Sequence, residues 1–469
     1  MAAFRESFDL ARLRERFRAG TLAAAGVAEE VLDRIAEAGD DKVWIERVPA
    51  ETLRARAAAL DAMVAREPKA RAGLPLFGVP FAVKDNIDVE GMTTTAGCPG
   101  FAYRARETAP AVARLLEAGA LLVGKTNLDQ FATGLVGTRS PYGVPRNPFD
   151  ARYIPGGSSS GSAVAVASGL VSFALGTDTA GSGRVPAAFN NIVGLKPTRG
   201  LVSARGVVPA CRSLDCVSIF APSCADAAEI LVHCGSYDAL DPFARPAAPP
   251  LTFRTPFRFA LPRAADLEFL GDAEAPGLYA HAAETLKALG GIAVEADLTP
   301  FRAAAALLYD GPWVAERLAA VGELFKRDPA ALLPVVRDII GGGARYSAVD
   351  AFKASYRLAE LRRATERLWS EADFLLLPTA GTIYRITEVE ADPVRLNANL
   401  GLYTNFVNLL DLSAIALPAG FRRDGLPFGV SCIAPAFAEA ALCTLGAAFE
   451  GRLGLPLGAT GRPLPARQG

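Results

Sequence analysis

The stretch Pro155–Arg184, PGGSSSGSAVAVASGLVSFALGTDTAGSGR, is the most informative part of this sequence. Two loops rich in Gly and Ser flank the run AVAVASG, which predicts a helix of about two turns built from small residues. The apolar run at Gly169–Gly176 is predicted to lie in the core. Residues 133–202 as a whole alternate polar loops with short apolar stretches, a pattern that indicates loops between core elements and not a linker.

Outward from this stretch, short apolar runs alternate with helical patterns. Buried strands are predicted at Leu76–Val83, Ala120–Val123, Asp373–Pro378 and Ala414–Pro418. Helices are predicted at Val27–Gly39, Ala50–Glu67, Pro110–Ala118, Ala275–Leu289 and from Pro300 to about Trp369. This alternation predicts an α/β fold with a mainly parallel or mixed sheet.

The chain is expected to divide into three parts. Residues 1–70 have helical patterns and are predicted to form an N-terminal helical segment packed on the core. Residues 71–455 form the main domain, in which Ala244–Pro256 is a linker rich in Pro and Ala. Residues 456–469 form a C-terminal tail, and Gly454–Gly469 is predicted to be a second linker rich in Pro and Ala.

Bulk composition excludes several classes of protein. The chain has 469 residues, 51% of them hydrophobic, and its 49 basic and 50 acidic residues leave a net charge of −1. This balance argues against a nucleic-acid surface and against a polybasic membrane patch. The first 20 residues mix charges of both signs and lack the apolar segment of a secretory signal. No apolar run reaches the roughly 18 residues that a spanning helix needs.

Cysteine and histidine usage narrows the chemistry further. The seven cysteines are odd in number and form no CxxC pair, which favours buried thiols in a reduced, cytoplasmic protein. His233 and His281 are the only histidines, and both have the surroundings of ordinary helix residues. A metal site built on histidines and a Ser-His-Asp triad are therefore disfavoured.

One phosphate-loop pattern is a false match. Gly119–Thr126, GALLVGKT, fits GxxxxGK[ST], but its four middle residues are apolar and predict a strand that follows a helix. A phosphate loop needs backbone amides that face phosphate, in the order strand, loop, helix. Nucleotide binding is therefore rejected, and Lys125 is interpreted as a structural residue.

The segment GTDTAGSGR has the features of a nucleophile loop. Its glycines allow close backbone approach, and the N–H groups of Thr179, Ala180, Gly181 and Ser182 can converge on one point as an oxyanion hole. Losing one such donor costs an enzyme about 2.7–4 kcal/mol of transition-state stabilisation. Ser182 is then placed to attack the carbon whose oxygen those amides hold.

Ser182 needs a base, and no histidine is at hand. Lys84 ends an apolar strand, where burial would lower a free lysine pKa of about 10.4 and favour the neutral amine. A second serine between the two residues could relay the proton. Each feature alone has a plain alternative, since Gly/Ser loops are usually just loops and a lysine after a strand is usually solvated. The combination of all three favours catalysis.

These motifs, Lys84-Asp85-Asn86, GGSSSGS and GTDTAGSGR, resemble those of the amidase signature family of serine amidases. The resemblance extends over roughly residues 25–450 and includes Lys125-Thr126-Asn127 and the segment Gly194–Gly200. It implies one domain with a large twisted mixed sheet of about eleven strands between helices. It also implies a Ser-cisSer-Lys triad, with Lys84 as base, Ser158 as the relay preceded by a cis peptide bond, and Ser182 as nucleophile.

Within this family the chain is most similar to the allophanate hydrolases, in GTDTAGSGRVPAAFNNIVGLKPTRG, in RGVVPACRSLDCVSIFA and in the segment Leu308–Arg317. The similarity implies that Tyr309 and Arg317 bind substrate and that Gly134 lines the pocket. Arginine's planar fork suits a carboxylate, and an eight-residue spacing could place both side chains on one helix face. The alternatives are that Arg317 is solvated and pairs with Glu316 or Glu323, and that Gly134 forms a plain turn.

The resemblance implies hydrolysis of allophanate in urea and s-triazine nitrogen metabolism, without cofactor or metal, by a cytoplasmic homodimer. No nucleic acid or membrane partner is expected. An amidase with a broader or different small-amide specificity is the alternative. Two departures stand out. The further C-terminal domain of many allophanate hydrolases is absent from this sequence, and Gln130 stands where many family members carry glutamate.

Overall fold

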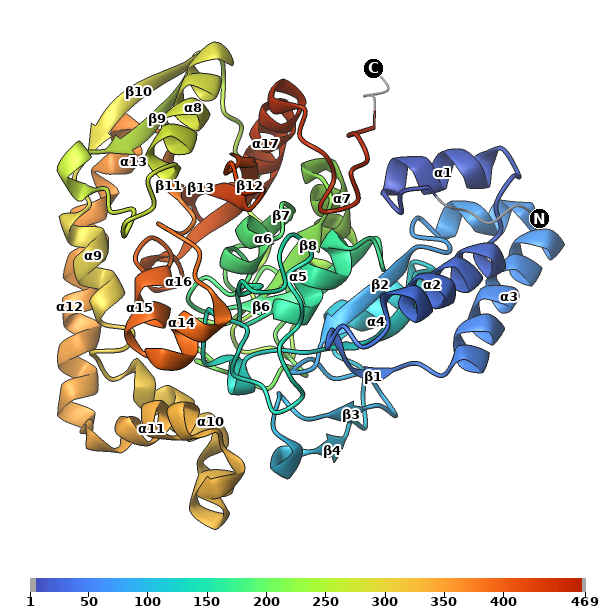
Figure 1. Cartoon of the computed structure of the whole chain (residues 1–469), viewed down its shortest axis with the longest axis horizontal. Helices are drawn as coiled ribbons and strands as arrows, with labels where there is room; N and C mark the ends of the chain where they lie inside the picture. Colours follow the sequence, from blue (N-terminus) through green and yellow to red (C-terminus); the bar gives the residue numbers. More distant parts are fainter. Residues whose placement is uncertain (1–5, 466–469) are drawn as a thin grey trace.

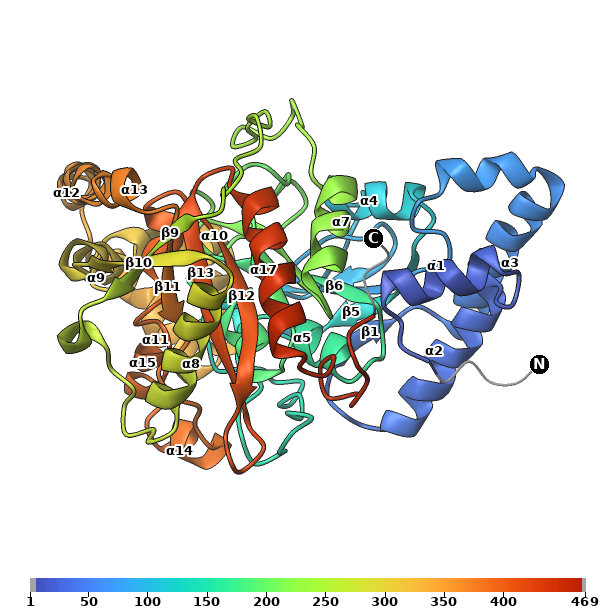
Figure 2. The same cartoon turned by 90° about the horizontal axis from the view of Figure 1, so that it is seen from above.

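A sheet of eleven strands runs through the whole molecule, in the order β1-β5-β2-β6-β8-β7-β12-β13-β11-β9-β10. The structure is a computed structural model that describes residues 6–465. The outermost residues of the predicted N-terminal segment and tail, 1–5 and 466–469, lie outside the described residues. Helices α1–α3 lie at one end of the molecule, and α9, α12 and α13 lie at the other (Figures 1 and 2).

The sheet strands are β1 (Trp44–Arg47), β2 (Pro80–Lys84), β5 (Leu121–Thr126), β6 (Phe173–Asp178), β7 (Val193–Lys196), β8 (Cys216–Ala221), β9 (Phe257–Pro262), β10 (Gly291–Ala296), β11 (Phe374–Pro378), β12 (Leu412–Phe421) and β13 (Pro427–Pro435). A separate small ribbon pairs β3 (Thr93–Thr94) with β4 (Tyr103–Arg104). The mixed α/β fold with about eleven strands is thus confirmed.

The helices are α1 (Leu10–Arg18), α2 (Ala24–Ala38), α3 (Ala50–Arg66), α4 (Pro110–Glu117), α5 (Ser160–Ala167), α6 (Val185–Phe189), α7 (Cys224–Cys234), α8 (Ala275–Ala288), α9 (Thr299–Ala306), α10 (Trp313–Arg327), α11 (Pro334–Gly341), α12 (Ala348–Glu366), α13 (Leu368–Glu371), α14 (Ile386–Ala391), α15 (Arg395–Leu400), α16 (Phe406–Leu409) and α17 (Glu439–Leu453). Short 3₁₀ turns occupy Pro68–Gly73, Pro99–Phe101, Gln130–Ala132, Ala264–Asp266, Pro329–Ala331 and Gly342–Arg345.

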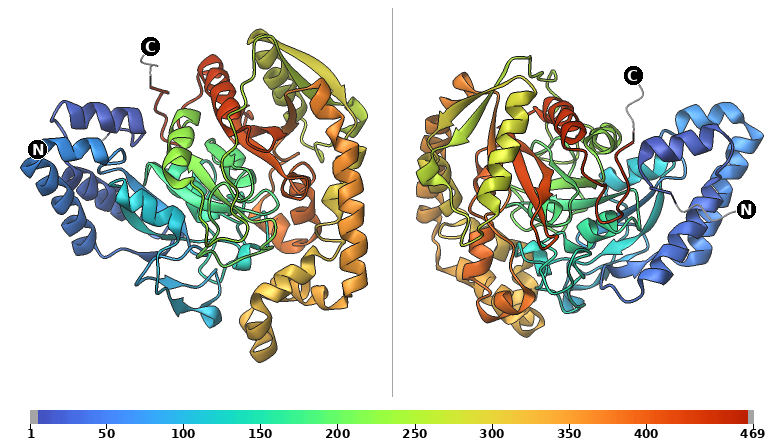
Figure 3. Two further views of the ribbon diagram at one scale, coloured as in Figure 1. Left: turned by 180° about the vertical axis from the view of Figure 1, so that it is seen from behind. Right: turned by 45° about the horizontal axis from the view of Figure 1, so that its top comes forward.

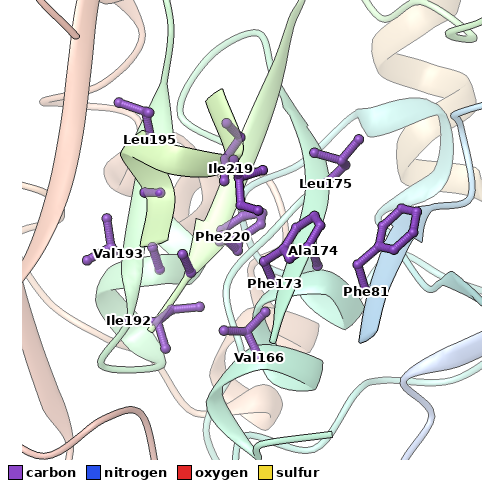
Figure 4. Packing of buried hydrophobic residues seen from close by; sticks show 14 of the residues in the cluster. Phe81, Val166, Phe173, Ala174, Leu175, Ile192, Val193, Leu195, Ile219 and Phe220 are labelled. Carbon is purple, nitrogen blue, oxygen red and sulfur yellow. The ribbon is translucent and has the colours of Figure 1, made fainter. Parts of the chain in front are cut away.

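Both faces of the sheet are buried. Successive residues of a strand point to opposite faces, so neighbouring residues belong to different hydrophobic clusters. In β11, Leu376 belongs to one hydrophobic cluster, whereas Leu375 and Leu377 belong to another. The centre of the first cluster is shown in Figure 4, where Phe81 and Phe173 extend from the neighbouring strands β2 and β6. Their rings stack with centroids 5.2 Å apart. Strands covered on both faces read as continuous apolar runs, which is why the sequence revealed several of them.

The N-terminal segment packs on the core, and it is not entirely helical. Leu13, Phe17, Val27 and Val31 from α1 and α2 are buried in the first cluster. Between α2 and α3, however, β1 pairs antiparallel with β5 and forms one edge of the sheet. Four residues carry too short a pattern to predict a strand, so the neighbouring strand decides this conformation.

The helices predicted beyond Pro300 are confirmed, whereas the expectation for the C-terminal tail needs correction. The helical pattern from Pro300 to about Trp369 is divided into α9–α13, separated by turns. The tail is docked and is not a linker: the Asn191 side chain donates to the backbone oxygens of Pro456 and Gly458 at 2.8 and 3.0 Å. In Figure 3 the tail runs between α7 and α1.

The cysteines and histidines lie where the sequence predicted. All seven cysteines fall within the described residues, are buried and form no disulfide. His233 and His281 lie within α7 and α8. Between residues 6 and 465, no helix combines the length and apolar character needed to cross a membrane.

Candidate active site

Two neighbouring parallel strands bring the predicted base and the nucleophile loop to one edge of the sheet. β2 ends at Lys84, and β6 ends at Asp178, four residues before Ser182. The two strands pair in parallel, with Val83 opposite Leu175, so their carboxyl ends share one edge. Ligand sites of α/β sheets form at such edges.

Lys84 is fully buried and makes two short hydrogen bonds. Its Nζ donates to Ser158 Oγ and to Thr177 Oγ1, each at 2.7 Å. Burial lowers the pKa of Lys84 to about 7, against the opposing charges of three nearby aspartates. The positive charge of Arg317 acts in the same direction as burial. A substantial fraction of the amine is therefore neutral near pH 7, the state in which it can accept a proton.

Ser158 lies two residues before the start of α5, and the peptide bond between Gly157 and Ser158 is cis. The backbone around it is tightly enclosed. A Cβ built on Gly157 would lie 2.2 Å from Asp129 Oδ2, so only glycine fits there. The Asp129 backbone N–H donates to the Ser158 carbonyl at 3.0 Å. These contacts hold Ser158 against the Lys84 amine.

The loop that carries Ser182 is held by a buried ion pair. Arg184 Nε and Nη2 donate to the two carboxylate oxygens of Asp178 at 2.9 and 3.0 Å. The same carboxylate accepts the N–H groups of Gly181 and Gly183, each at 2.9 Å. Both ends of the turn around Ser182 are thereby fixed to one side chain.

The hydrogen bonds to Asp178 exclude Gly181 from the four predicted oxyanion donors. The N–H of Gly181 is already engaged by Asp178, because the aspartate caps the turn. The N–H groups of Thr179, Ala180 and Ser182 donate to no acceptor among residues 6–465. Three of the four predicted donors are therefore free for an oxyanion.

Asp215 is a buried residue of the site that the sequence did not single out. It accepts hydrogen bonds from the Thr179 hydroxyl and from the N–H groups of Ala210 and Cys211. Burial raises the pKa of its carboxyl to about 6. Two residues earlier, Ser213 donates through its N–H and hydroxyl to Glu316 of α10. The sequence did contain a signal for this residue, because Asp215 is the one charged residue in the mainly apolar run LDCVSIFA.

Arg317 and Tyr309 come together, though not on one helix as predicted. Tyr309 lies in the turn between α9 and α10, because the chain leaves the helical conformation after Ala306. Arg317 Nη2 donates to the Tyr309 hydroxyl at 3.3 Å, and Arg317 Nη1 to Thr133 Oγ1 at 3.0 Å. The predicted alternative, a solvated Arg317, is wrong, since only 1% of the side chain is exposed.

Gly134 and Gln130 lie in the loop next to Arg317. A Cβ on Gly134 would lie 2.5 Å from Asp129 Oδ2, so this position is more than a plain turn. Gln130 Nε2 donates to the carbonyls of Gly97 and Ala331, and its Oε1 accepts from the Leu333 N–H. A glutamate could not make both donations, which accounts for the amide at this position.

A cavity of about 590 Å³ opens beside Tyr309. Arg139, Arg302, Asn397 and Asn405 also line it. Lys125 lies in β5, away from this cavity, and forms an ion pair with Asp85 at 3.2 Å. This position agrees with a structural role. Residues 6–465 contain no cluster of three or more metal-ligating side chains.

Comparison with known proteins gives a clear family. The sequence profile named Amidase matches residues 26–443. The chain belongs to the amidase family. A urea amidolyase from Saccharomyces cerevisiae is 45% identical over 90% of this chain, and the match covers 23% of that much longer protein. The chain thus spans about a quarter of the length of this relative.

Two further relatives are named for different reactions. The solved structure of a Kluyveromyces lactis allophanate hydrolase is 42% identical, superposes with a TM-score of 0.87, and is matched over 91% of this chain and 70% of its own. A component of the glutamyl-tRNA(Gln) amidotransferase from Symbiobacterium thermophilum is 37% identical, over 94% of this chain and 96% of its own. The chain accordingly belongs to a family whose name refers to the cleavage of amide bonds.

Proposed function

We propose that this chain is a serine amidohydrolase that converts allophanate (urea-1-carboxylate) to N-carboxycarbamate and ammonia, with onward breakdown to carbon dioxide and ammonia. The observation that carries the proposal is the buried Arg317 guanidinium, which bonds Tyr309 and forms no ion pair with any carboxylate of residues 6–465. A buried charge needs a partner. A substrate carboxylate would supply one, and the similarity to the K. lactis enzyme supports that choice.

In this proposal the acylation step begins with neutral Lys84. Lys84 takes the Ser182 hydroxyl proton through Ser158, while Ser182 Oγ attacks the terminal amide carbonyl. Arg317 holds the carboxylate, and Tyr309 and the loop at Gly134 hold the urea-like body. The free amides of the nucleophile loop stabilise the oxyanion. The relay then gives its proton to the leaving nitrogen, the C–N bond breaks, and ammonia departs.

Deacylation reverses the proton path. The relay removes a proton from water, the water oxygen attacks the acyl carbon, and the Ser182 ester bond breaks. Ser182 recovers its proton from the relay, and the released product carries two carboxyl groups on one nitrogen. These steps use side chains, backbone amides and water alone, so the proposal names no cofactor and no metal.

Replacement of the nucleophile tests the proposal directly. Ser182→Ala should abolish ammonia release from allophanate, because no alternative hydroxyl would receive the acyl group. The melting temperature of the variant should match that of the wild type. Near-normal turnover in Ser182→Ala would show that another residue is the nucleophile.

Replacement of Arg317 tests the substrate. A hydrogen bond to a charged group contributes about 1.5–3 kcal/mol. Arg317→Ala should therefore lower kcat/KM for allophanate roughly 10- to 100-fold and change hydrolysis of neutral amides far less. An equal loss on both substrates would remove Arg317 from carboxylate recognition.

An amidase that acts on a broader range of small amides is the second candidate. The 37% identity to an amidotransferase component adds an amidotransferase role as a further alternative. Ammonia release from allophanate, biuret, urea and simple amides, compared on the purified chain, separates the two. A requirement for a carboxylate favours allophanate. Activity that appears only with partner chains and tRNA would favour an amidotransferase role.

The proposed setting is a cytoplasmic homodimer that serves urea and s-triazine nitrogen metabolism. Buried thiols without disulfides support a reducing compartment. We assign the catalytic domain to residues 71–455, with residues 1–70 packed on it and 456–469 as the tail. Ammonia release and the melting temperature, measured on residues 71–469 alone, would test whether the N-terminal segment is needed for folding.

A further inference from the structure

Four arginines among residues 6–465 are buried, and they fall into two groups. Arg184 and Arg422 form ion pairs with Asp178 and Asp272 at 2.9 and 2.7 Å. Arg139 and Arg317, with 3% and 1% of their surfaces exposed, form no ion pair with any carboxylate in the described range. Burying an unpaired charge is costly, so two such residues side by side need an explanation.

Both unpaired arginines bind the same residue. Arg139 Nη1 donates to the backbone oxygen of Thr133 at 2.8 Å, and Arg317 Nη1 donates to the Thr133 hydroxyl at 3.0 Å. Burial lowers the pKa of Arg139, the negative charge of Asp129 opposes this shift, and the positive charge of Arg317 adds to it, so Arg139 and Arg317 are close enough to interact electrostatically. Arg139 and Tyr309 also line the cavity of about 590 Å³. Arg139 therefore lines the cavity directly, and Arg317 is joined by a hydrogen bond to a second cavity-lining residue, Tyr309.

The two guanidiniums retain unused hydrogen-bonding capacity. Each carries five N–H donors. In both residues the Nε is buried and has no hydrogen-bond partner. Unsatisfied buried donors are rare in native proteins and mark sites that a missing group completes. A carboxylate is the group that best satisfies such donors, because it accepts parallel hydrogen bonds from planar guanidinium forks.

We propose that Arg139 is a second carboxylate-binding residue, which acts with Arg317 as a paired-guanidinium subsite and sets the preference for anionic over neutral amides. This inference rests on the function proposed above and deepens it. Two positive charges offset the desolvation of one substrate carboxylate better than one. The pair also disfavours neutral amides, which would bring no carboxylate within ion-pair distance of either guanidinium.

A structural role for Arg139 makes a different prediction. Arg139 Nη2 also donates to the carbonyl of Pro393, so the side chain ties the loop at Thr133 to the segment before α15. Loss of that tie alone would impair every substrate equally. The decisive quantity is therefore the ratio of kcat/KM for allophanate to kcat/KM for biuret, the neutral analogue in which a carboxamide replaces the carboxylate.

The experiment compares this ratio in the wild type, Arg139→Gln and Arg302→Gln. Arg302 is the matched control, because it lines the same cavity but is paired with Glu268 at 3.3 Å. Arg139→Gln should lower the ratio at least about tenfold, mainly through a higher KM for allophanate. Arg302→Gln should leave the ratio within about twofold. An equal loss on both substrates in Arg139→Gln overturns the inference.

A second variant covers the case in which Arg139→Gln does not fold. Asn397 lines the cavity, and its Oδ1 accepts the Leu135 N–H at 2.8 Å. Asn397→Asp keeps that acceptor and adds a carboxylate that would neutralise the subsite. The ratio should again fall, and an unchanged ratio would overturn the inference. A wild type that releases no ammonia from allophanate would instead overturn the proposed function itself.

Discussion

Lys84 illustrates how one residue changes its chemistry through its surroundings. A lysine in water is protonated at pH 7 and cannot act as a base. Here the amine is enclosed by the Ser158 and Thr177 hydroxyls and by the strand it ends, and burial lowers its pKa to about 7. Desolvation disfavours the charged form, so the contacts that exclude water favour the neutral amine that the proposed base requires.

A pH profile tests this base. Only the neutral amine can accept the Ser182 proton, so kcat/KM should rise as Lys84 loses its proton around pH 7 and level off above it. Below pH 7 the rate should fall towards tenfold per pH unit. Initial rates of ammonia release between about pH 6 and 9 measure this limb. A flat profile through pH 7 would contradict the assignment.

Lys84→Met serves as the control for that profile. The methionine fills similar space without a titratable group, so activity should be lost at every pH in the range. Far-ultraviolet circular dichroism should show an intact fold. Residual activity with an unchanged limb would assign the titration to another group, of which Asp215, with a pKa of about 6, is a candidate within the site.

At the scale of elements, the turn between β6 and α6 depends on one ion pair. Asp178 ends β6, and Arg184 precedes α6. Their side chains are fully buried and joined by two hydrogen bonds, and the carboxylate also holds two backbone amides of the turn. The ion pair therefore shapes the nucleophile loop although neither side chain belongs to the proposed triad.

Breaking this pair should destabilise the protein strongly. Arg184→Gln leaves a buried carboxylate without its charged partner, which costs about 3–5 kcal/mol. Urea denaturation should show that loss. Arg152→Gln is the matched control, because the Arg152–Asp150 pair lies on the surface, with 70% of the arginine side chain exposed. Equal stability of the two variants would contradict the role given to the buried pair.

At the scale of the whole molecule, one helix presents an unusual surface. Val349, Phe352 and Tyr356 of α12 are 60%, 63% and 65% exposed and lie on one side of the helix. Their spacing of three and four residues makes them neighbours on that side. Exposed apolar groups of this kind are found where proteins associate. This surface supports the proposed homodimer.

Light scattering on the purified chain tests the assembly. The expected mass is twice the 49.1 kDa of one chain. Phe352→Glu should shift the mass towards 49.1 kDa if α12 lies in the interface, because the interface would bury an unpaired charge. A wild-type mass of one chain would contradict the homodimer, and a dimeric Phe352→Glu would place the interface elsewhere.

Much of the fold followed from local patterns. The runs around Leu76–Val83 and Asp373–Pro378 predicted strands because strands buried on both faces are continuously apolar. The helices α2, α3 and α8 followed from apolar spacing and their terminal residues. The Gly- and Ser-rich segments around Ser158 and Ser182 pointed to their chemistry, since serine with flexible backbone and no histidine nearby restricts the possible mechanisms.

Other features depend on distant residues and were decided by the tertiary structure alone. Strand β1 exists because β5 offers it a partner. The burial of Arg139 and Arg317 and the position of Asp215 arise where segments more than 30 residues apart pack together. A sequence names the residues that can ionise or donate. Which of them lose water, and which find a partner, is determined only when the sheet brings the loops together.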